Sequence, residues 1–211
     1  MNIPKKRVFL IGTSGTVGSA VLRMLRERGH DVVAADYDAD PDNGELRIDI
    51  TDSASIAAAY AAVGEVHAVA CTVGVVPLLP LHETTLAHVD EAIRGKLSSQ
   101  IEIVLQGLSH VREGGSFTLI SGIMSRMPWR GGIGASIVDG GIEAFVIGAA
   151  AELGRDRRIN AVSPTILQES VDKIGINLLP GHQPVPAALV AGAYLRSIEG
   201  IETGQTFCVG H

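Results

Sequence analysis

The chain opens with an apolar run, a glycine-rich loop and an amphipathic helix, an order that restricts the folds open to it. The run RVFLIG (7–12) has the composition of a buried strand, and TVGSAVLRMLRERG (16–29) has helical spacing and a closing glycine. A second apolar run, HDVVAAD (30–36), follows directly. Strands joined in this way are parallel and need a right-handed crossover, so the opening predicts a βαβ unit.

The same alternation of strands and helices continues to the end of the chain. After a loop at 37–45, the sequence predicts strands at residues 46–48, 66–73, 115–122, 158–163 and 205–210. It predicts helices that begin at Asp52 or Ser53, that run from 84 to 111 with a bend near Gly95, and that cover 135–154 and 187–199. We therefore expect an α/β fold over residues 1–211, a single domain built on a doubly wound, Rossmann-type parallel sheet of about seven strands with helices on both faces.

The charge of the chain bears on the partners it can bind. Its 211 residues carry a formal net charge of −6, and the basic residues form no block beyond Lys5, Lys6 and Arg7. Binding to nucleic acid or to a membrane surface needs a concentrated positive field, so neither partner is expected. No apolar run is expected to reach the roughly 18–20 residues of a membrane span, and the N-terminus lacks a signal-peptide pattern. The sequence indicates a soluble cytoplasmic protein.

Cysteine and histidine usage argues against disulfides and metals. Cys71 and Cys208 fall at the ends of predicted strands and form neither a disulfide framework nor a metal-binding spacing, so both are expected to be reduced core residues. The 7 histidines also lack the spacing of metal ligands, and no metal site is predicted.

The loop between the first strand and its helix has the composition of a phosphate-binding loop. Its glycines let the backbone turn tightly and approach a pyrophosphate without an intervening Cβ atom. The N-terminus of the next helix would then supply amide donors and a positive dipole. The residues predicted to bind a cofactor here are Gly12, Thr13, Ser14, Gly15, Thr16, Val17 and Gly18. A purely structural loop is the alternative.

An acid ends the second predicted strand. Asp36 lies 18 residues after Gly18, where a carboxylate would accept hydrogen bonds from the adenosine ribose and would repel a 2′-phosphate. Tyr37 and Asp38 follow, with no arginine beside them in the sequence. We therefore expect Asp36 and Tyr37 to contact the cofactor, and NAD(H) to be favoured over NADP(H). The alternative is a solvated turn acid.

Later motifs complete a resemblance to a known family. They are DIT (49–51), CTVG (71–74), FTLISG (117–122), INAVSPT (159–165) and TGQTFCVG (203–210), in this order. Together with the glycine loop they make the sequence similar to the short-chain dehydrogenase/reductase family over nearly its whole length. The spacing of the loop differs, because the commonest form of the family's motif has its middle glycine at the position of Thr16.

The resemblance implies further contacts with a nicotinamide dinucleotide. Asp49 and Ile50 would hold the adenine, and Pro164 would lie near the nicotinamide. The residues implied along the adenosine side of the pocket are Cys71, Thr72, Val73 and Gly74. The alternative is that all of these are ordinary turn and strand-end residues.

Members of the family share a proton-transfer set that this chain lacks. They use a tyrosine, a lysine four residues later that lowers the tyrosine's pKa, a serine that orients the substrate and an asparagine in a proton relay. Alignment on the family's helix puts Ala135 at the tyrosine position and Asp139 at the lysine position, with Gly122 at the serine position and Lys96 at or beside the asparagine position. Alanine cannot transfer a proton, and an aspartate raises the pKa of a neighbouring acid. Orthodox catalysis is therefore not expected.

Other polar side chains near the predicted site are candidates for its chemistry. They are Lys96, Ser121, Ser125 and Ser136. A desolvated lysine can act as an acid, so Lys96 is a candidate to replace the missing cation. The alternatives are that Ser121 only satisfies a strand end, that Ser136 sits in the first turn of a helix, and that Lys96 is a solvated charge.

Two features bear on the substrate. The segment after Pro164, where family members carry a substrate lid, is short and implies a small or shallow pocket. Met124, Met127 and Trp129 either wall an apolar substrate pocket or pack the loop after the fifth predicted strand.

Two functions follow from this sequence. The first is an NAD(P)-dependent oxidoreductase with a non-standard active site that acts on a small carbonyl or alcohol. The alternative is a catalytically inactive dinucleotide-binding protein, a sensor or a structural partner. The resemblance also implies a homodimer or homotetramer formed through the helices at 84–111 and after Ala135.

Overall fold

The seven strands in the described part of the chain form one parallel sheet. The computed structural model describes residues 4–127, 129–154, 156–175 and 181–211. The strands are β1 (Arg7–Ile11), β2 (Asp31–Asp36), β3 (Leu46–Arg47), β4 (Val66–Cys71), β5 (Val111–Ile120), β6 (Arg158–Pro164) and β7 (Thr206–Val209). Their order is β3-β2-β1-β4-β5-β6-β7, so the chain reverses its direction across the sheet between β1 and β4. This confirms the predicted Rossmann-type sheet, and ligands of such sheets bind where the order reverses.

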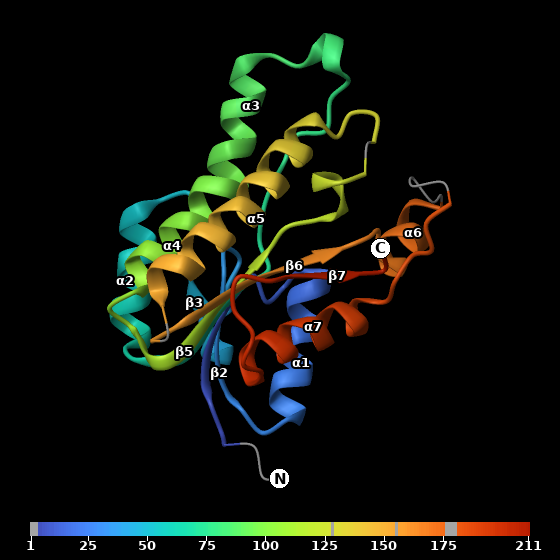
Figure 1. Ribbon diagram of the computed structural model, residues 1–211. Helices are drawn as coiled ribbons and strands as arrows, with labels where there is room; N and C mark the ends of the chain where they lie inside the picture. The colour runs from blue at the N-terminus through green and yellow to red at the C-terminus, as the bar shows by residue number, and fades with distance from the viewer. Residues whose placement is uncertain (1–3, 128, 155, 176–180) are drawn as a thin grey trace.

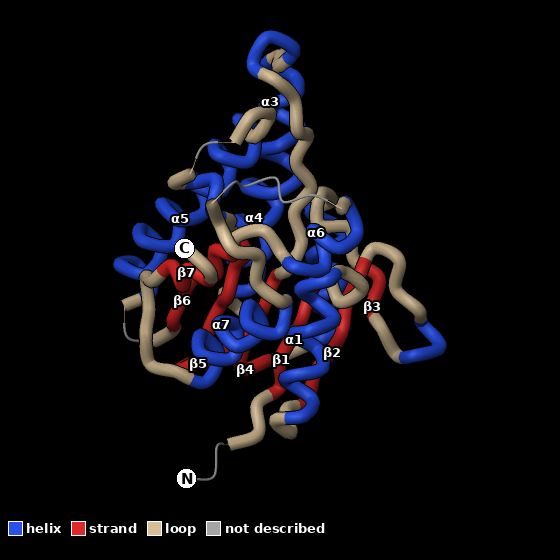
Figure 2. The backbone as a smooth tube through the Cα atoms, turned by 90° about the vertical axis from the view of Figure 1, so that its right-hand side faces the viewer, coloured by secondary structure: helices blue, strands red, loops and turns tan. Residues whose placement is uncertain are grey.

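Helices cover both faces of the sheet (Figure 1, Figure 2). On one face α1 (Thr16–Glu27) packs against α7 (Ala187–Glu199). The other face is covered by α2 (Ser53–Val63), α4 (Ser99–Gly107) and α5 (Ile133–Leu153). The remaining elements are η1 (Pro41–Asn43), η2 (Leu81–Glu83), α3 (Leu86–Ala92), the π-helical turn η3 (Ile93–Ser98), η4 (Ile123–Ser125) and α6 (Gln168–Ile174).

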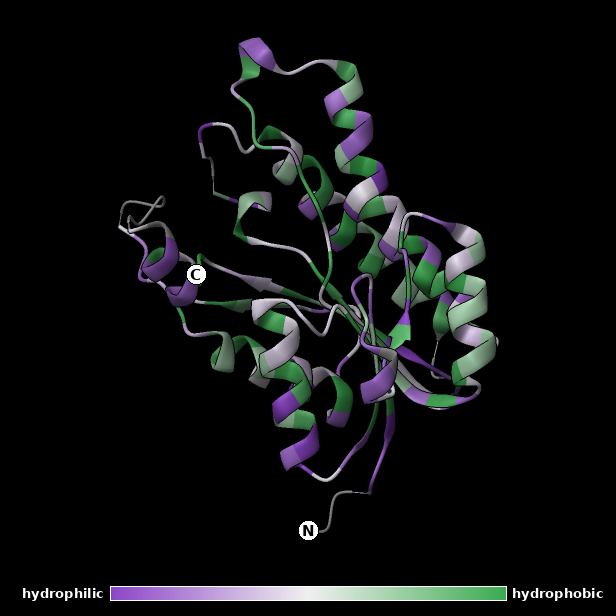
Figure 3. Ribbon diagram, turned by 180° about the vertical axis from the view of Figure 1, so that it is seen from behind, coloured by the Kyte–Doolittle hydropathy of each residue, from purple (hydrophilic) through white to green (hydrophobic). Residues whose placement is uncertain are grey.

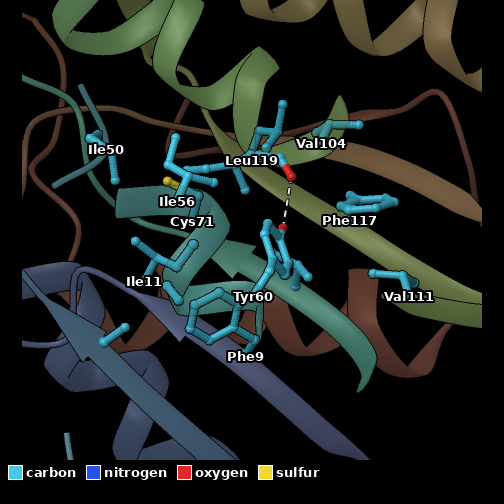
Figure 4. Close-up of a cluster of buried hydrophobic side chains, with 14 of the residues drawn as sticks. Phe9, Ile11, Ile50, Ile56, Tyr60, Cys71, Val104, Val111, Phe117 and Leu119 are labelled. Carbon is cyan, nitrogen blue, oxygen red and sulfur yellow. Dashed lines mark hydrogen bonds between the residues drawn. The ribbon is translucent and has the colours of Figure 1, made fainter. Parts of the chain in front are cut away.

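Each face of the sheet has its own hydrophobic core, because successive strand residues point to opposite sides. Phe9 and Ile11 belong to the core beneath α2, α4 and α5, whereas Leu10 belongs to the core beneath α1 and α7. Tyr60 of α2 is buried in the first of these cores. Its hydroxyl donates a hydrogen bond to the Ile103 carbonyl oxygen at 2.7 Å (Figure 4).

Strand β5 begins four residues earlier than predicted. Val111 is buried and pairs with Val66 of β4, although the register between the two strands shifts before Ala68. The two glycines at 114–115 weaken the strand pattern in the sequence, so periodicity alone placed the start at the second of them.

The helix predicted over 84–111 consists of α3, η3 and α4, and it ends at Gly107. The predicted bend near Gly95 coincides with the π-helical turn. A Cβ atom on Gly95 would lie 2.6 Å from the Val75 carbonyl oxygen, and the Val75 amide donates to the Gly95 oxygen at 3.2 Å. The turn is therefore packed directly against the segment that follows β4.

Two expectations about individual segments need correction. Cys71 is buried as expected, but Cys208 is exposed because β7 is the edge strand of the sheet. By length and composition alone, α5 is apolar enough to cross a membrane, contrary to the expectation that no run reaches this length. In this fold Ile142 and Val146 of α5 are fully buried in the core beneath it.

The buried hydroxyl of Tyr60 provides a test of the core. Tyr60→Phe should lower the free energy of unfolding by about 1–3 kcal/mol, because the Ile103 carbonyl loses its buried partner. Urea unfolding would measure this change. Tyr37→Phe is the matched control, since Tyr37 is exposed, and its effect should be within about 0.5 kcal/mol. Equal stabilities of the two variants would contradict the assignment.

Candidate functional site

The glycine loop closes β1 and opens α1 at the point where the strand order reverses. Gly12 has a φ of +94°, which favours glycine, and a Cβ atom there would lie 2.2 Å from Val73 Cγ2. A Cβ atom on Gly18 would lie 1.7 Å from the Gly12 carbonyl oxygen. Both positions therefore require glycine so that α1 can approach β1 and the end of β4.

The middle of the loop has a different character. A Cβ atom on Gly15 would make only an ordinary contact, at 3.7 Å, and Gly15 begins α1 without a side-chain cap. The first amides of α1 are thus free of side-chain caps, as an anion-binding helix N-terminus requires. The Thr13 hydroxyl is buried and has no hydrogen-bond partner among the described residues. This loop fits the diphosphate of a dinucleotide.

Asp36 is tied to the same loop. Its Oδ2 accepts a hydrogen bond from the Ser14 amide at 2.8 Å, and its Oδ1 lies 3.4 Å from the Asp38 amide. The carboxylate is buried at the end of β2. It therefore combines a structural contact with the position from which an adenosine ribose would be bound.

A cavity of about 160 Å³, here called the Asp36 cavity, lies beside these residues. Its lining includes most of the residues expected at the adenosine end of a cofactor. These are Gly12, Asp36, Tyr37, Asp49, Ile50 and Val73. Hydrogen bonds from the Thr51 hydroxyl at 2.7 Å and from its amide at 2.9 Å lower the pKa of Asp49.

Sequence reasoning missed a cation that lies over Tyr37, one of the residues that line this cavity. Arg47 of β3 pairs with Asp36 across the sheet, and its guanidinium lies 5.4 Å from the centre of the exposed Tyr37 ring. No arginine lies beside Asp36 in the sequence, but strand pairing brings the backbone of Arg47 next to it. The β2–β3 pairing, 11 residues along the chain, is the signal that would have found it.

The residues predicted at the end of β4 divide between the core and the site. The side chain of Cys71 lies in the hydrophobic core, and burial raises the pKa of its thiol to about 12. The Thr72 hydroxyl lies 2.9 Å from the Gly12 oxygen and 3.0 Å from the Ile11 oxygen, so it holds the glycine loop. Gly74 and Pro164 line a second cavity.

This second cavity, of about 290 Å³, is here called the Lys96 cavity. It is walled by all four residues that the family resemblance assigns to catalytic positions or, for Lys96, beside one, together with one predicted serine. These are Lys96, Ser121, Gly122, Ala135 and Asp139. Ala135 contributes only a methyl group. Polar chemistry in this cavity must therefore come from its neighbours.

Lys96 and Asp139 form an ion pair in the wall of the cavity. The Lys96 ammonium donates to Asp139 Oδ1 at 2.6 Å and to the Ser121 carbonyl oxygen at 3.1 Å. The side chains are only 11% and 2% exposed. An ammonium carries three N–H groups, so one is left without a partner among the described residues. Burial raises the pKa of Asp139, although the Lys96 charge opposes this effect.

Two glycines make room for this ion pair. A Cβ atom on Gly122 would lie 2.7 Å from Asp139 Oδ2, and one on Gly74 would lie 2.4 Å from Lys96 Cγ. A serine side chain at position 122 would therefore collide with the carboxylate. The residues at positions 96, 122 and 139 are thus mutually dependent.

The predicted serines have other partners. The hydroxyls of Ser121 and Ser125 lie 3.0 and 2.9 Å from Glu143 Oε1, and Arg126 pairs with the same carboxylate at 2.6 Å. Ser125 and Ser136 are not among the residues that line the Lys96 cavity. Of the four candidate catalytic residues, Lys96 is thus the one that lines the cavity and has an N–H group without an acceptor among the described residues.

The family resemblance implies that Pro164 and the residues after it lie near the nicotinamide, and Thr165 is the first of these residues. It lines the Lys96 cavity directly after Pro164, and its buried hydroxyl has no hydrogen-bond partner in the described part of the chain. Such a group fits a polar ligand that would lie across the cavity. Among the described residues no cluster of histidine, cysteine and acidic side chains could hold a metal ion.

Comparisons with known proteins agree with this architecture. A family model described as enoyl-(acyl carrier protein) reductase matches residues 12–177. The structure of the protein lin1944 from Listeria innocua is 39% identical and has a TM-score of 0.90, over 96% of this chain and 98% of that one.

More distant structures share the fold. A small-chain dehydrogenase solved in complex with NADPH is 23% identical, with a TM-score of 0.81 over 98% of this chain and 97% of that one. A short chain dehydrogenase from Mycobacterium smegmatis is 20% identical, with a TM-score of 0.84 over 99% of this chain and 93% of that one. None of the curated proteins compared with this sequence matches it.

The buried ion pair predicts a strong dependence of stability on both partners. Lys96→Met and Asp139→Leu should each cost about 3–5 kcal/mol, because each leaves an unpaired buried charge, whereas the double variant should cost much less than their sum. Urea unfolding of all four proteins gives the coupling. Asp31→Asn, which breaks the half-exposed pair with Arg7, is the control and should cost at most about 1 kcal/mol. Additive losses would contradict the pairing.

Proposed function

Because this chain belongs to the short-chain dehydrogenase/reductase family, we propose that it is an NAD(P)-dependent oxidoreductase acting on a carbonyl or alcohol group of a small-molecule substrate. The observation that carries the proposal is the Lys96 ammonium. Asp139 and Ser121 hold it in the wall of the Lys96 cavity, and the resemblance puts it at or beside the family's asparagine position, with one N–H left for a substrate oxygen. The complex of a similarly folded dehydrogenase with NADPH supports a nicotinamide cofactor.

The residues that would hold the cofactor follow the fold from the Asp36 cavity to the Lys96 cavity. Asp49 and Ile50 would flank the adenine, and Asp36 would accept hydrogen bonds from the adenosine ribose. The amides of the glycine loop and the unpartnered Thr13 hydroxyl would bind the diphosphate. Thr165 and its neighbour Pro164 would lie beside the nicotinamide.

The nucleotide preference depends on two opposed charges. The Asp36 carboxylate would repel a 2′-phosphate, and this repulsion favours NAD(H). Arg47 pairs with Asp36 in the sheet and its guanidinium lies over the Tyr37 ring, where its positive charge would attract a 2′-phosphate. Asp36 is the nearer to the glycine loop, since it accepts from the Ser14 amide. The proposal is therefore NAD(H) as the preferred cofactor.

The proton step would belong to Lys96. A bound dihydronicotinamide supplies hydride to the carbonyl carbon. Lys96 would hydrogen-bond the carbonyl oxygen through its third N–H and transfer that proton as the C=O bond becomes an alkoxide. Asp139 would keep the ammonium in place and balance its charge. Water entering through the Lys96 cavity, which the 11% exposed Lys96 side chain lines, would restore the proton.

A second candidate is a dinucleotide-binding protein without turnover. Ala135 favours it, because no phenol stands at the position where the family has its proton donor. The two candidates predict the same cofactor binding and differ only in the chemistry at Lys96.

An assembly from identical subunits accompanies either function. The outer faces of α4 and α5 carry exposed apolar side chains, among them Leu105, Ile137 and Ile147. These support the homodimer or homotetramer that the family resemblance implies.

Cofactor choice can be measured directly. NADH should bind at least about tenfold more tightly than NADPH, and Asp36→Asn should narrow that ratio by removing the repulsion of the 2′-phosphate. Arg47→Gln should weaken NADPH alone. Fluorescence titration of the reduced nucleotides gives the dissociation constants. Tighter binding of NADPH by the unaltered protein would reverse the assignment, and absence of binding to both would remove both candidate functions.

Turnover should depend on Lys96. The double variant Lys96→Met/Asp139→Leu removes the ammonium without leaving a buried charge, and it should lower kcat/KM by about 10²–10⁴ while NADH still binds. NADH oxidation against a panel of aldehydes and ketones measures this effect. Lys5→Met, an exposed lysine near the N-terminus, is the control. An unchanged rate would exclude Lys96, and NADH binding with no turnover by the unaltered protein would favour the second candidate.

A further inference from the structure

A large open groove lies next to the Lys96 cavity and is not explained by the proposed cofactor. This outer groove has a volume of about 690 Å³, and its lining is mostly apolar. The residues that matter for the argument are Leu78, Pro80, Leu81, Trp129, Arg130 and Ile133. The small or shallow pocket implied by the short segment after Pro164 stays a prediction. Residues 176–180 of the short segment after Pro164 lie outside the described part of the chain.

The outer groove continues the Lys96 cavity. Leu78 and Trp129 line both spaces, so a ligand that reaches Lys96 can extend past these two side chains. Figure 3 shows the segment that leads from the sheet up to η2 as a hydrophobic stretch. Exposed Leu78 and Leu81 lie on this stretch and at the start of η2. An extended apolar chain would cover both.

A positively charged side chain, Arg130, lies in the outer groove. Arg130 lines the outer groove but not the Lys96 cavity, and it makes no ion pair with any described residue. His82, which lies in the same groove, pairs with Glu83 at 3.3 Å. An unpaired guanidinium beside an apolar channel is suited to a carboxylate at the far end of an aliphatic chain.

We propose that the substrate is a straight-chain compound with a carbonyl or alcohol at one end and a carboxylate at the other. Its reacting end enters the Lys96 cavity, its chain occupies the outer groove, and its carboxylate binds Arg130. The proposal rests on the proposed oxidoreductase function for the reacting group only. Occupancy of the groove is a binding property that can be measured without turnover.

Trp129 is the one tryptophan of the chain, so its fluorescence reports ligands at the junction of the two spaces. The unaltered protein would be titrated with 1-hexanol, 1-decanol, 10-hydroxydecanoate and methyl 10-hydroxydecanoate. 1-Decanol should bind at least about tenfold more tightly than 1-hexanol, since each fully buried methylene is worth about a fourfold gain. The hydroxy acid should bind more tightly than its methyl ester. Equal affinity for the two alcohols, or for the acid and its ester, would overturn the proposal.

Two exposed leucines give a matched pair of variants. Leu81 is 72% exposed and lines the groove, whereas Leu86 is 75% exposed and does not. Leu81→Asp should weaken 1-decanol binding at least about tenfold, and Leu86→Asp should leave it unchanged. Arg130→Gln should weaken 10-hydroxydecanoate and spare its methyl ester. Equal effects of the two leucine variants, or of Arg130→Gln on acid and ester, would contradict the assignment.

These measurements separate the groove from the chemistry. Length-dependent binding of alcohols, with no NADH binding or turnover, would sink the proposed function and leave the groove assignment standing. NADH-dependent turnover of short carbonyl compounds, with no gain in binding affinity from a longer chain or from a terminal carboxylate, would contradict the groove assignment and support the proposed function.

Discussion

The ammonium of Lys96 and the carboxylate of Asp139 meet at 2.6 Å where water has little access, and the geometry of the surrounding site follows from this contact. Two charges in such a place are tolerated only when they are paired and hydrogen-bonded. The pair occupies the space that a side chain on Gly122 would fill and brings Lys96 against Gly74. This ion pair thereby restricts positions 74 and 122 to glycine.

The two parts of the sheet edge that carries the site differ in character. On the side of β1 and β2, the glycine loop, Asp36 and the Asp36 cavity have the features expected of a dinucleotide site. On the side of β5 and α5, the residues that the resemblance assigns to the proton-transfer set lie together around the Lys96 cavity. The hydroxyls of Ser121 and Ser125 hydrogen-bond Glu143. Of Ser121, the Lys96 ammonium therefore meets only the carbonyl oxygen, and it keeps an N–H for the cavity.

Sequence reasoning recovered the sheet and most of its helices, because strand composition and helix spacing are local properties. It also predicts that Ala135, Asp139, Gly122 and Lys96 depart from the family pattern, and this alignment stays a prediction. It did not find that three of these departures are coupled, because Lys96 and Asp139 are 43 residues apart and meet only in the folded chain. Arg47 was missed for the same reason, since only the pairing of β2 with β3 brings it next to Asp36 and Tyr37.

The π-helical turn between α3 and α4 makes the orientation of α3 depend on the number of residues in this segment. Such a turn holds one more residue than an α-helical turn, and each residue of a helix advances the side chains by about 100°. Loss of one residue between Ile93 and Ser98 would restore a continuous α-helix and rotate α3 relative to α4 by that angle. The number of residues in this turn therefore determines which side chain of the segment faces the cavity, in addition to the identity of residue 96.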